Sequence, residues 1–153
     1  IKLDDVDINI IKTSHDTSDA RSFILTSNNR SLVYLTDTGY INQKYFPLLT
    51  NRNVYLFESN HDIEMLLNGP YPKWLKDRVM GPYGHLSNKD SSIYLAKLIG
   101  QDTKKIVLLH LSHKNNTPEK ALSTIYDTFA EYEVNLQAIC CAEQKNKSEM
   151  IDV

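Results

Sequence analysis

The sequence is poor in the residues that mark specialised protein classes. Its two cysteines, Cys140 and Cys141, are adjacent in a segment that is typical of a strand, and this excludes a disulfide framework. Its five glycines and five prolines form no repeat or low-complexity tract. The longest apolar run is too short to span a bilayer, and no signal sequence opens the chain. We therefore expect a cytoplasmic protein without a membrane partner.

What is present is the composition of a globular domain. Hydrophobic residues make up 41% and charged residues 24% of the 153 positions, which predicts one domain, or part of one, with a sizeable core. The formal net charge of -2 argues against a basic module that coats DNA non-specifically. It does not exclude a nuclease, because metal ions in a site can supply the positive charge that meets a phosphate.

Apolar runs predict a sheet within an α/β layered domain. Residues 5–10 alternate polar and apolar as a strand does, at the very start of a chain without an initiator Met, so we expect a fragment of a longer protein. Runs over 23–25 and 32–35 flank a polar turn and predict a hairpin. Further strands are expected over 54–57, 106–109 and 136–141.

Three helices are predicted among these strands. One opens at Thr117-Pro118-Glu119, which supplies an N-cap, a proline at the first helical position and an acid in the first turn. A second is expected over 89–99, ending at Gly100. A third is expected over 74–79, after two prolines that break the chain. The tail 143–153 is polar, and we expect it to be mobile.

Residues with metal-binding side chains follow the predicted strands. His15, Asp37, Glu58 and His110 each lie at or just beyond the C-terminal end of a strand, where a rigid sheet presents side chains to a common cleft. Together they suggest a metal site. Singly, Asp37 is also typical of a turn and His15 of an exposed loop. His85 precedes a predicted helix and can equally serve to support its N-terminus.

Several short motifs, in order and at regular spacing, resemble one known family. They are Thr36-Asp37-Thr38-Gly39-Tyr40, Phe57-Glu58-Ser59-Asn60-His61-Asp62, Gly69-Pro70-Tyr71-Pro72, Gly84-His85-Leu86-Ser87-Asn88, and His110-Leu111-Ser112 with Asn115-Asn116. Over residues 5–140 the chain resembles the C-terminal half of WalJ/YycJ-type proteins, a branch of DNA exonucleases with the metallo-β-lactamase fold. The resemblance implies that residues 1–142 form the C-terminal half of a metallo-β-lactamase αββα sandwich, followed by the tail.

The resemblance also implies a set of metal ligands. His15 and His110 match histidine ligands of the first and second metal, and Asp37 matches the aspartate that bridges the two. Two divalent cations, Zn²⁺ or Mn²⁺, suit these nitrogen and oxygen donors. Such a pair lowers the pKa of a bound water and stabilises in-line attack at phosphorus.

Other residues are expected around these ligands. Glu58 and His85 resemble the acid and imidazole that the related ribonuclease Z branch pairs for proton transfer, and we expect them to be catalytic. Contacts to the substrate, or support of the ligands, are expected from Asn60, His61 and Asn88.

One motif of the family is missing. The sequence contains no His-x-His-x-Asp-His, so three expected ligands remain for a site that needs about seven. We therefore expect this chain alone to bind metals weakly or not at all and to be inactive. Half a sandwich would also leave an apolar face exposed, and this favours oligomerisation or association through that face.

The leading functional hypothesis is a metal-dependent phosphodiesterase that acts on DNA ends. A second hypothesis is the hydrolysis of RNA or of a small phosphodiester, because related branches share these motifs on one fold. A third is a non-catalytic, truncated paralogue that serves as a binding or regulatory module, and its support is the missing ligand motif.

Overall fold

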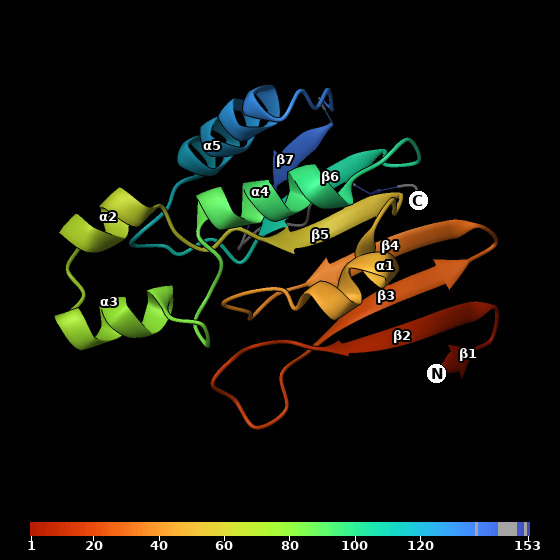
Figure 1. Cartoon of the computed structure of the whole chain (residues 1–153), viewed down its shortest axis with the longest axis horizontal. Coiled ribbons are helices and arrows are strands. Elements are labelled where there is room, and N and C mark those ends of the chain that lie inside the picture. The colour runs from red at the N-terminus through yellow and green to blue at the C-terminus, as the bar shows by residue number, and fades with distance from the viewer. Residues whose placement is uncertain (137, 144–149, 152) are drawn as a thin grey trace.

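A seven-stranded sheet organises the part of the chain that the structure describes. This computed structural model describes residues 1–136, 138–143, 150, 151 and 153. The strands lie side by side in sequence order, as β1 (Lys2–Leu3), β2 (Val6–Lys12), β3 (Arg21–Ser27), β4 (Arg30–Leu35), β5 (Val54–Glu58), β6 (Lys105–Leu109) and β7 (Ile139–Cys141). Figure 1 shows this order across the sheet. The predicted α/β layered class is confirmed.

The first four strands form the antiparallel half of the sheet. β2 pairs with β3 through Ile10 and Phe23, and β3 pairs with β4 in the predicted hairpin. The hairpin turns at Asn28 and Asn29, whose φ angles are 48° and 62°. Two successive positive φ angles are the mark of a type I′ turn, and asparagine tolerates them better than most residues.

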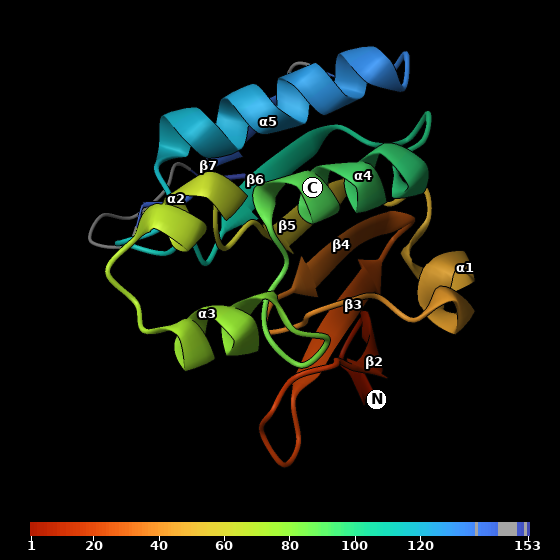
Figure 2. The same ribbon diagram turned by 60° about the vertical axis from the view of Figure 1, so that its left-hand side comes forward.

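The last four strands run parallel, and helices cover one of their faces. β5 and β6 are nearly continuous apolar runs, which is the pattern expected of buried parallel strands. Helices α4 (Asn88–Leu98) and α5 (Pro118–Glu131) lie side by side over this half of the sheet, as Figure 2 shows. Leu95 of α4, Ile125 of α5 and Phe57 of β5 are fully buried in the core between these layers.

The three predicted helices are present, with small shifts at their ends. Thr117 caps α5 through its side chain, which accepts from the Lys120 amide. α4 ends at Leu98 rather than at Gly100, because Ile99 already has an extended backbone. The helix expected over 74–79 is α3 (Lys73–Met80). None of the described helices has the length and apolar character that a membrane span requires.

Three short helical segments were not predicted. They are η1 (Gln43–Tyr45), α1 (Phe46–Leu49) and α2 (Ile63–Asn68). α2 had a signal in the sequence, because Asp62 is its N-cap and accepts a hydrogen bond from the Met65 amide. Of the strand expected over 136–141, residues 139–141 form β7 and residue 137 lies outside the described residues. Most of the tail expected over 143–153 also lies outside them.

The face of the sheet opposite the helices carries half-exposed apolar side chains. On β3 and β4 they alternate with the buried residues of the core face, whereas on β2 most of the alternating residues are exposed. They are Val6, Ile8, Ile10, Phe23, Leu25 and Leu32, together with the more exposed Tyr34. An apolar face of this kind is what the sequence predicts for this half of the molecule.

Candidate metal centre

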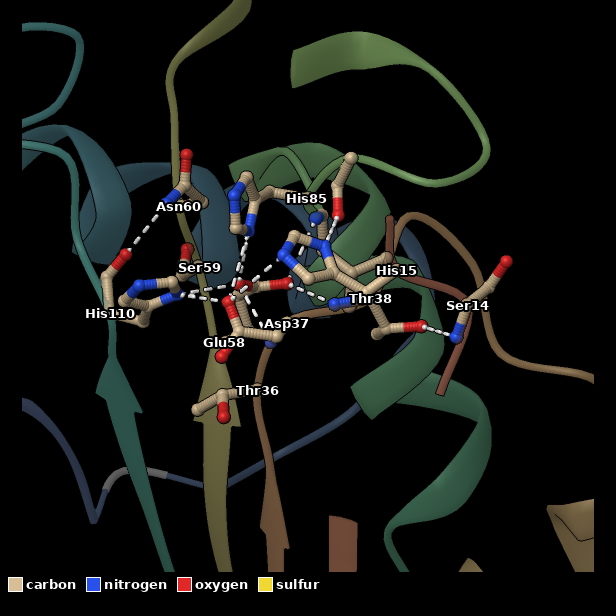
Figure 3. Close-up of polar contacts among 12 residues, drawn as sticks. Ser14, His15, Thr36, Asp37, Thr38, Glu58, Ser59, Asn60, His85 and His110 are labelled. Atoms are coloured by element: carbon tan, nitrogen blue, oxygen red, sulfur yellow. Dashed lines mark hydrogen bonds and ion pairs between the residues drawn. The ribbon is translucent and has the colours of Figure 1, made fainter. Parts of the chain in front are cut away.

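The direction of the strands explains why distant residues meet at one edge of the sheet. β2 and β4 are both antiparallel to β3, and β4, β5 and β6 are parallel, so these four strands end at the same edge. His15 follows β2, Asp37 follows β4, Glu58 ends β5 and His110 follows β6. His85 arrives at this edge from the loop before α4. Figure 3 shows the five side chains gathered there.

Asp37 lies at the centre of the three histidines. Its Oδ1 is 3.7 Å from Nε2 of His15, 3.8 Å from Nδ1 of His85 and 3.7 Å from Nδ1 of His110. Asp37, Glu58, His85 and His110 offer ligand atoms that all lie within 4.8 Å of one another. The imidazoles and the aspartate that the sequence singles out therefore face one point.

Glu58 is buried beneath this group and has hydrogen-bond partners at both oxygens. Its Oε1 accepts from the Asp37 amide at 3.1 Å and lies 2.9 Å from Nδ1 of His85 and 2.7 Å from Nδ1 of His110. Its Oε2 accepts from the amides of Thr38 and Leu86. With five donors in place, the Glu58 carboxylate orients its neighbours rather than pointing into open space.

These donors also keep Glu58 ionised. Burial raises the pKa of the Glu58 carboxyl, but hydrogen bonds from His110 and His85 outweigh burial and lower this pKa to about 2. The bond to Glu58 raises the pKa of His110 in turn. An ionised carboxylate can only accept hydrogen bonds, so Nδ1 of both histidines must carry a proton. Nε2 is then the nitrogen with a free lone pair in the neutral ring.

His15 is held in the same tautomer by a different group. Its Nδ1 lies 3.0 Å from the carbonyl oxygen of Gly84, and a carbonyl can only accept. Nε2 therefore faces Asp37 and Asp16, and in the neutral ring it is the nitrogen that carries the lone pair. Neutral imidazoles with a fixed tautomer, beside a carboxylate, are a donor set that suits Zn²⁺ or Mn²⁺. The residues present fit a metal on this ground.

Two of the candidate ligands have an uncommon backbone conformation. Asp37 has a φ of 55° and His110 a φ of 60°, each immediately beyond a strand. Left-handed conformations of residues other than glycine cost energy and concentrate at functional sites. This conformation directs the side chains of Asp37 and His110 towards Glu58.

The remaining predicted site residues lie behind this group. Asn60 lines the cleft described below, and its amide donates to the His110 carbonyl at 2.9 Å. Asn88 is buried, and its Oδ1 accepts from the Ser59 hydroxyl. His61 is also buried, and burial together with the charge of His85 lowers its pKa to about 4, so its ring is neutral. Asn88 and His61 are absent from the described lining of the cleft.

Sequence reasoning missed Asn116, which connects these supports. Its side-chain amide nitrogen lies within hydrogen-bond distance of the Ser59 and Asn60 carbonyls and of Asn88 Oδ1. Its own Oδ1 accepts from Asn88 and from the Thr117 amide. The pair Asn115-Asn116 beside His110 was the available signal, but a pattern does not reveal that one amide joins three segments.

A cleft of about 500 Å³ opens at the metal centre. His15, His85 and His110 line it, and its walls are formed by α3, the loops around α3, and the loops after β2 and β6. The walls contribute polar and aromatic side chains that were not predicted to belong to the site. They are Asp16, Tyr71, Arg78, Ser112, His113 and Lys114.

The sequence is similar to that of two named exodeoxyribonucleases over most of the chain. No protein-family model matches the sequence. The chain is 36% identical over 127 residues to exodeoxyribonuclease YycJ of Bacillus anthracis, which is 83% of this chain and 48% of the relative. It is 37% identical over 132 residues to exodeoxyribonuclease WalJ of Streptococcus pneumoniae, which is 86% and 49%. The chain thus spans about half the length of these curated relatives.

Solved structures are similar over between 38% and 49% of their length. YhfI from Bacillus subtilis, a metallo-β-lactamase fold protein, has a TM-score of 0.67 at 15% identity and covers 94% of this chain with 49% of its own. A diphosphatase of the PhnP family has a TM-score of 0.57 at 15% identity, over 93% and 42%. Human tRNase Z, short form, has a TM-score of 0.55 at 15% identity, over 74% and 38%.

The sheet, its covering helices and these structural matches define a metallo-β-lactamase fold. Within that class the chain is a homologue of the YycJ and WalJ proteins over most of its length. Both the fold and the family predicted from the motifs are thereby confirmed.

Proposed function

We propose that this chain is part of a metal-dependent phosphodiesterase that removes nucleotides from DNA ends through a dinuclear metal centre. The observation that carries the proposal is the convergence of three imidazoles and Asp37 around the buried, ionised Glu58. The exodeoxyribonuclease names of the two relatives support DNA as the substrate.

His15, Asp37 and His110 would hold the metal ions. Nδ1 of each imidazole is fixed by an acceptor, which leaves Nε2 as the ligand atom, and Asp37 Oδ1 lies 3.7 Å from the nearer nitrogen of each ring. Zn²⁺ or Mn²⁺, when bound, would activate a water molecule and neutralise the phosphate charge. The further ligands that a dinuclear centre needs would come from the remaining length that the relatives possess.

His85 would pass a proton to the leaving oxygen. Its Nδ1 is held by Glu58, so the ring presents Nε2 to the cleft. In the doubly protonated ring, Nε2 carries the proton that would pass to the leaving oxygen, and the ring would be left neutral. Glu58 then acts as the positioning residue, because it fixes both His85 and His110 without reaching the cleft itself. His61 and Asn88 would support this frame from behind, and Asn60, which lines the cleft, would contact the substrate or support His110.

The test uses the full-length natural protein that contains this chain, with Mn²⁺ or Zn²⁺ added. Labelled single- and double-stranded DNA should be cleaved in the presence of metal and left intact in the presence of a chelator. Asp37→Asn should abolish the cleavage. Metal-dependent DNA cleavage that is absent, or that persists unchanged in Asp37→Asn, contradicts the proposal.

Two alternative functions can be distinguished by the substrates that the protein cleaves. Side-by-side rates on DNA, RNA and cyclic nucleotides distinguish a DNA exonuclease from an RNA or small-phosphodiester hydrolase. Binding of metal and DNA without cleavage of any of them would instead favour a non-catalytic module.

A further inference from the structure

A second hollow borders the metal centre on the side of His15. It has a volume of about 320 Å³, and His15 is the one described residue that lines both it and the cleft. Three segments form it: the loop after β2, the stretch from residue 40 to 45, and the loop before α4. Figure 3 shows Ser14, which also lines this hollow, on the opposite side of the view from His110.

The charge of this hollow differs from that of the whole chain. Lys12 and Lys44 line it, and the described residues that line it include no acid. The chain as a whole has a formal net charge of -2. The two lysines therefore place positive charge beside the metal centre, where it would attract an anionic polymer.

Aromatic rings stand beside these lysines. Tyr40, Tyr45 and Tyr83 line the hollow, and Tyr40 and Tyr83 are 43% and 63% exposed. The Lys44 ammonium lies 4.9 Å from the centre of the Tyr45 ring, so a cation and an aromatic face form one surface. Exposed tyrosine faces interleaved with lysines match single-stranded nucleic acid, whose bases stack and whose phosphates seek cations.

We propose that this hollow, defined by Lys12, Tyr40, Lys44, Tyr45 and Tyr83, binds the single DNA strand that continues from the nucleotide at the metal centre. The proposal rests on the proposed function and adds a path for the uncleaved strand. Lys12 and Lys44 contact phosphates, and the two exposed tyrosines stack on unpaired bases. The shared position of His15 places the bound strand next to the scissile phosphodiester.

The test measures DNA binding without cleavage. The full-length natural protein, with metal removed by a chelator, is titrated with a fluorescent single-stranded oligonucleotide of about ten nucleotides over a range of salt concentrations. In the double variant Lys12→Gln/Lys44→Gln, affinity should fall and its logarithmic dependence on salt should become shallower by about 0.7 for each lysine. A merely structural effect would leave that slope unchanged.

A second pair of variants tests the stacking. Tyr40→Ala and Tyr83→Ala should each weaken binding of the single strand by about fivefold or more, with a smaller effect on a duplex of the same sequence. Matched controls lie on and after α5: the exposed Lys120→Gln, and Tyr132→Ala, whose side chain is 43% exposed like that of Tyr40. Both controls should bind DNA as the parent does.

Two results would overturn the strand path. One is a salt dependence and affinity of the double lysine variant equal to those of the parent, and the other is an equal loss in the control variants. Metal-dependent hydrolysis of the p-nitrophenyl ester of thymidine monophosphate by the parent protein is measured separately. Its absence counts against the metal centre alone, because binding in the presence of a chelator does not depend on catalysis.

Discussion

Nδ1 of His110 lies 2.7 Å from Oε1 of Glu58, a carboxylate with no exposed surface. The contact joins the ends of two neighbouring parallel strands, so the sheet itself sets the distance between acid and imidazole. The acid is ionised and can only accept, which fixes the proton of His110 on Nδ1. The buried Glu58 thus fixes the ring orientation and tautomer of the partly exposed His110 before a metal binds.

The first prediction concerns Glu58→Gln. A glutamine amide must place a donor against donors, at His85 and His110 on one side or at the Thr38 and Leu86 amides on the other. We expect metal affinity and activity of the full-length protein to fall by about 10–100-fold, the usual effect of losing such a partner. Metal titration calorimetry measures the affinity.

The matched control is the exposed Glu64→Gln on α2, which should bind metal as the parent does. Nitrogen NMR of the imidazoles gives a second readout, since His85 and His110 should have Nδ1 protonated in the parent and lose that uniform state in Glu58→Gln. Unchanged metal affinity together with unchanged imidazole signals would refute the positioning role of Glu58.

The second prediction separates ligation from folding at Asp37. Asparagine tolerates a φ of 55° about as well as aspartate, whereas alanine does not. Asp37→Asn should therefore fold like the parent, with the same thermal midpoint without metal, but should lose metal affinity by at least about 10–100-fold. Asp19→Asn, at a 62% exposed side chain on the loop after β2, is the control. Retention of full metal affinity by Asp37→Asn would mean that Asp37 is not a ligand.

Much of the fold could be predicted because its signals are local. The hairpin at Asn28-Asn29, the continuous runs of β5 and β6, and the cap of α5 each arise within a few residues of sequence. α2 was not predicted because it is only six residues long. α4 ends earlier than predicted because the backbone is already extended at Ile99, before Gly100. Short elements and exact ends depend on tertiary contacts that a single sequence does not display.

The candidate site was predictable only in part. Strand ends indicated where His15, Asp37, Glu58 and His110 would meet, because parallel strands share an edge. The positions of the strand ends do not reveal which oxygen of Glu58 accepts a hydrogen bond from which imidazole. Nor does it reveal that Asn116 joins three segments, since that contact spans more than fifty residues.

The third prediction concerns Gly84, whose carbonyl accepts from His15. A Cβ at Gly84 would lie 2.2 Å from the Val79 carbonyl oxygen and 2.3 Å from that of Arg78, so the backbone must move. Gly84→Ala should cost about 1–3 kcal/mol of stability and weaken metal binding by displacing His15.

Gly81→Ala, in the same loop, is the comparison. Its nearest contact would be 3.1 Å, to the Asp77 carbonyl oxygen, and a shift of a few tenths of an ångström relieves it. Chemical denaturation should rank the losses of stability as Gly84→Ala above Gly81→Ala. Equal stability of Gly84→Ala and the parent would show that the loop accommodates a Cβ at this position, and would contradict the prediction.

The fourth prediction concerns stability at alkaline pH and depends on Tyr55, which lies on β5 near the end opposite Glu58. The Tyr55 side chain is fully buried, and its hydroxyl oxygen lies 2.7 Å from the Leu49 carbonyl and 3.0 Å from that of Leu98. Burial raises the pKa of Tyr55 from 10.0 to about 12, against a smaller lowering by the Arg52 amide. The fold therefore requires the neutral phenol.

Because the folded pKa is the higher one, the contribution of Tyr55 to stability is complete below pH 10 and is lost as pH rises to about 12. A difference of two pKa units corresponds to about 3 kcal/mol. Tyr55→Phe should be less stable than the parent at neutral pH by about 1–3 kcal/mol, because a buried carbonyl loses its donor. Its stability should then decline less between pH 10 and 12, so the two denaturation curves approach each other. Parallel curves over that range would show that Tyr55 does not ionise on unfolding.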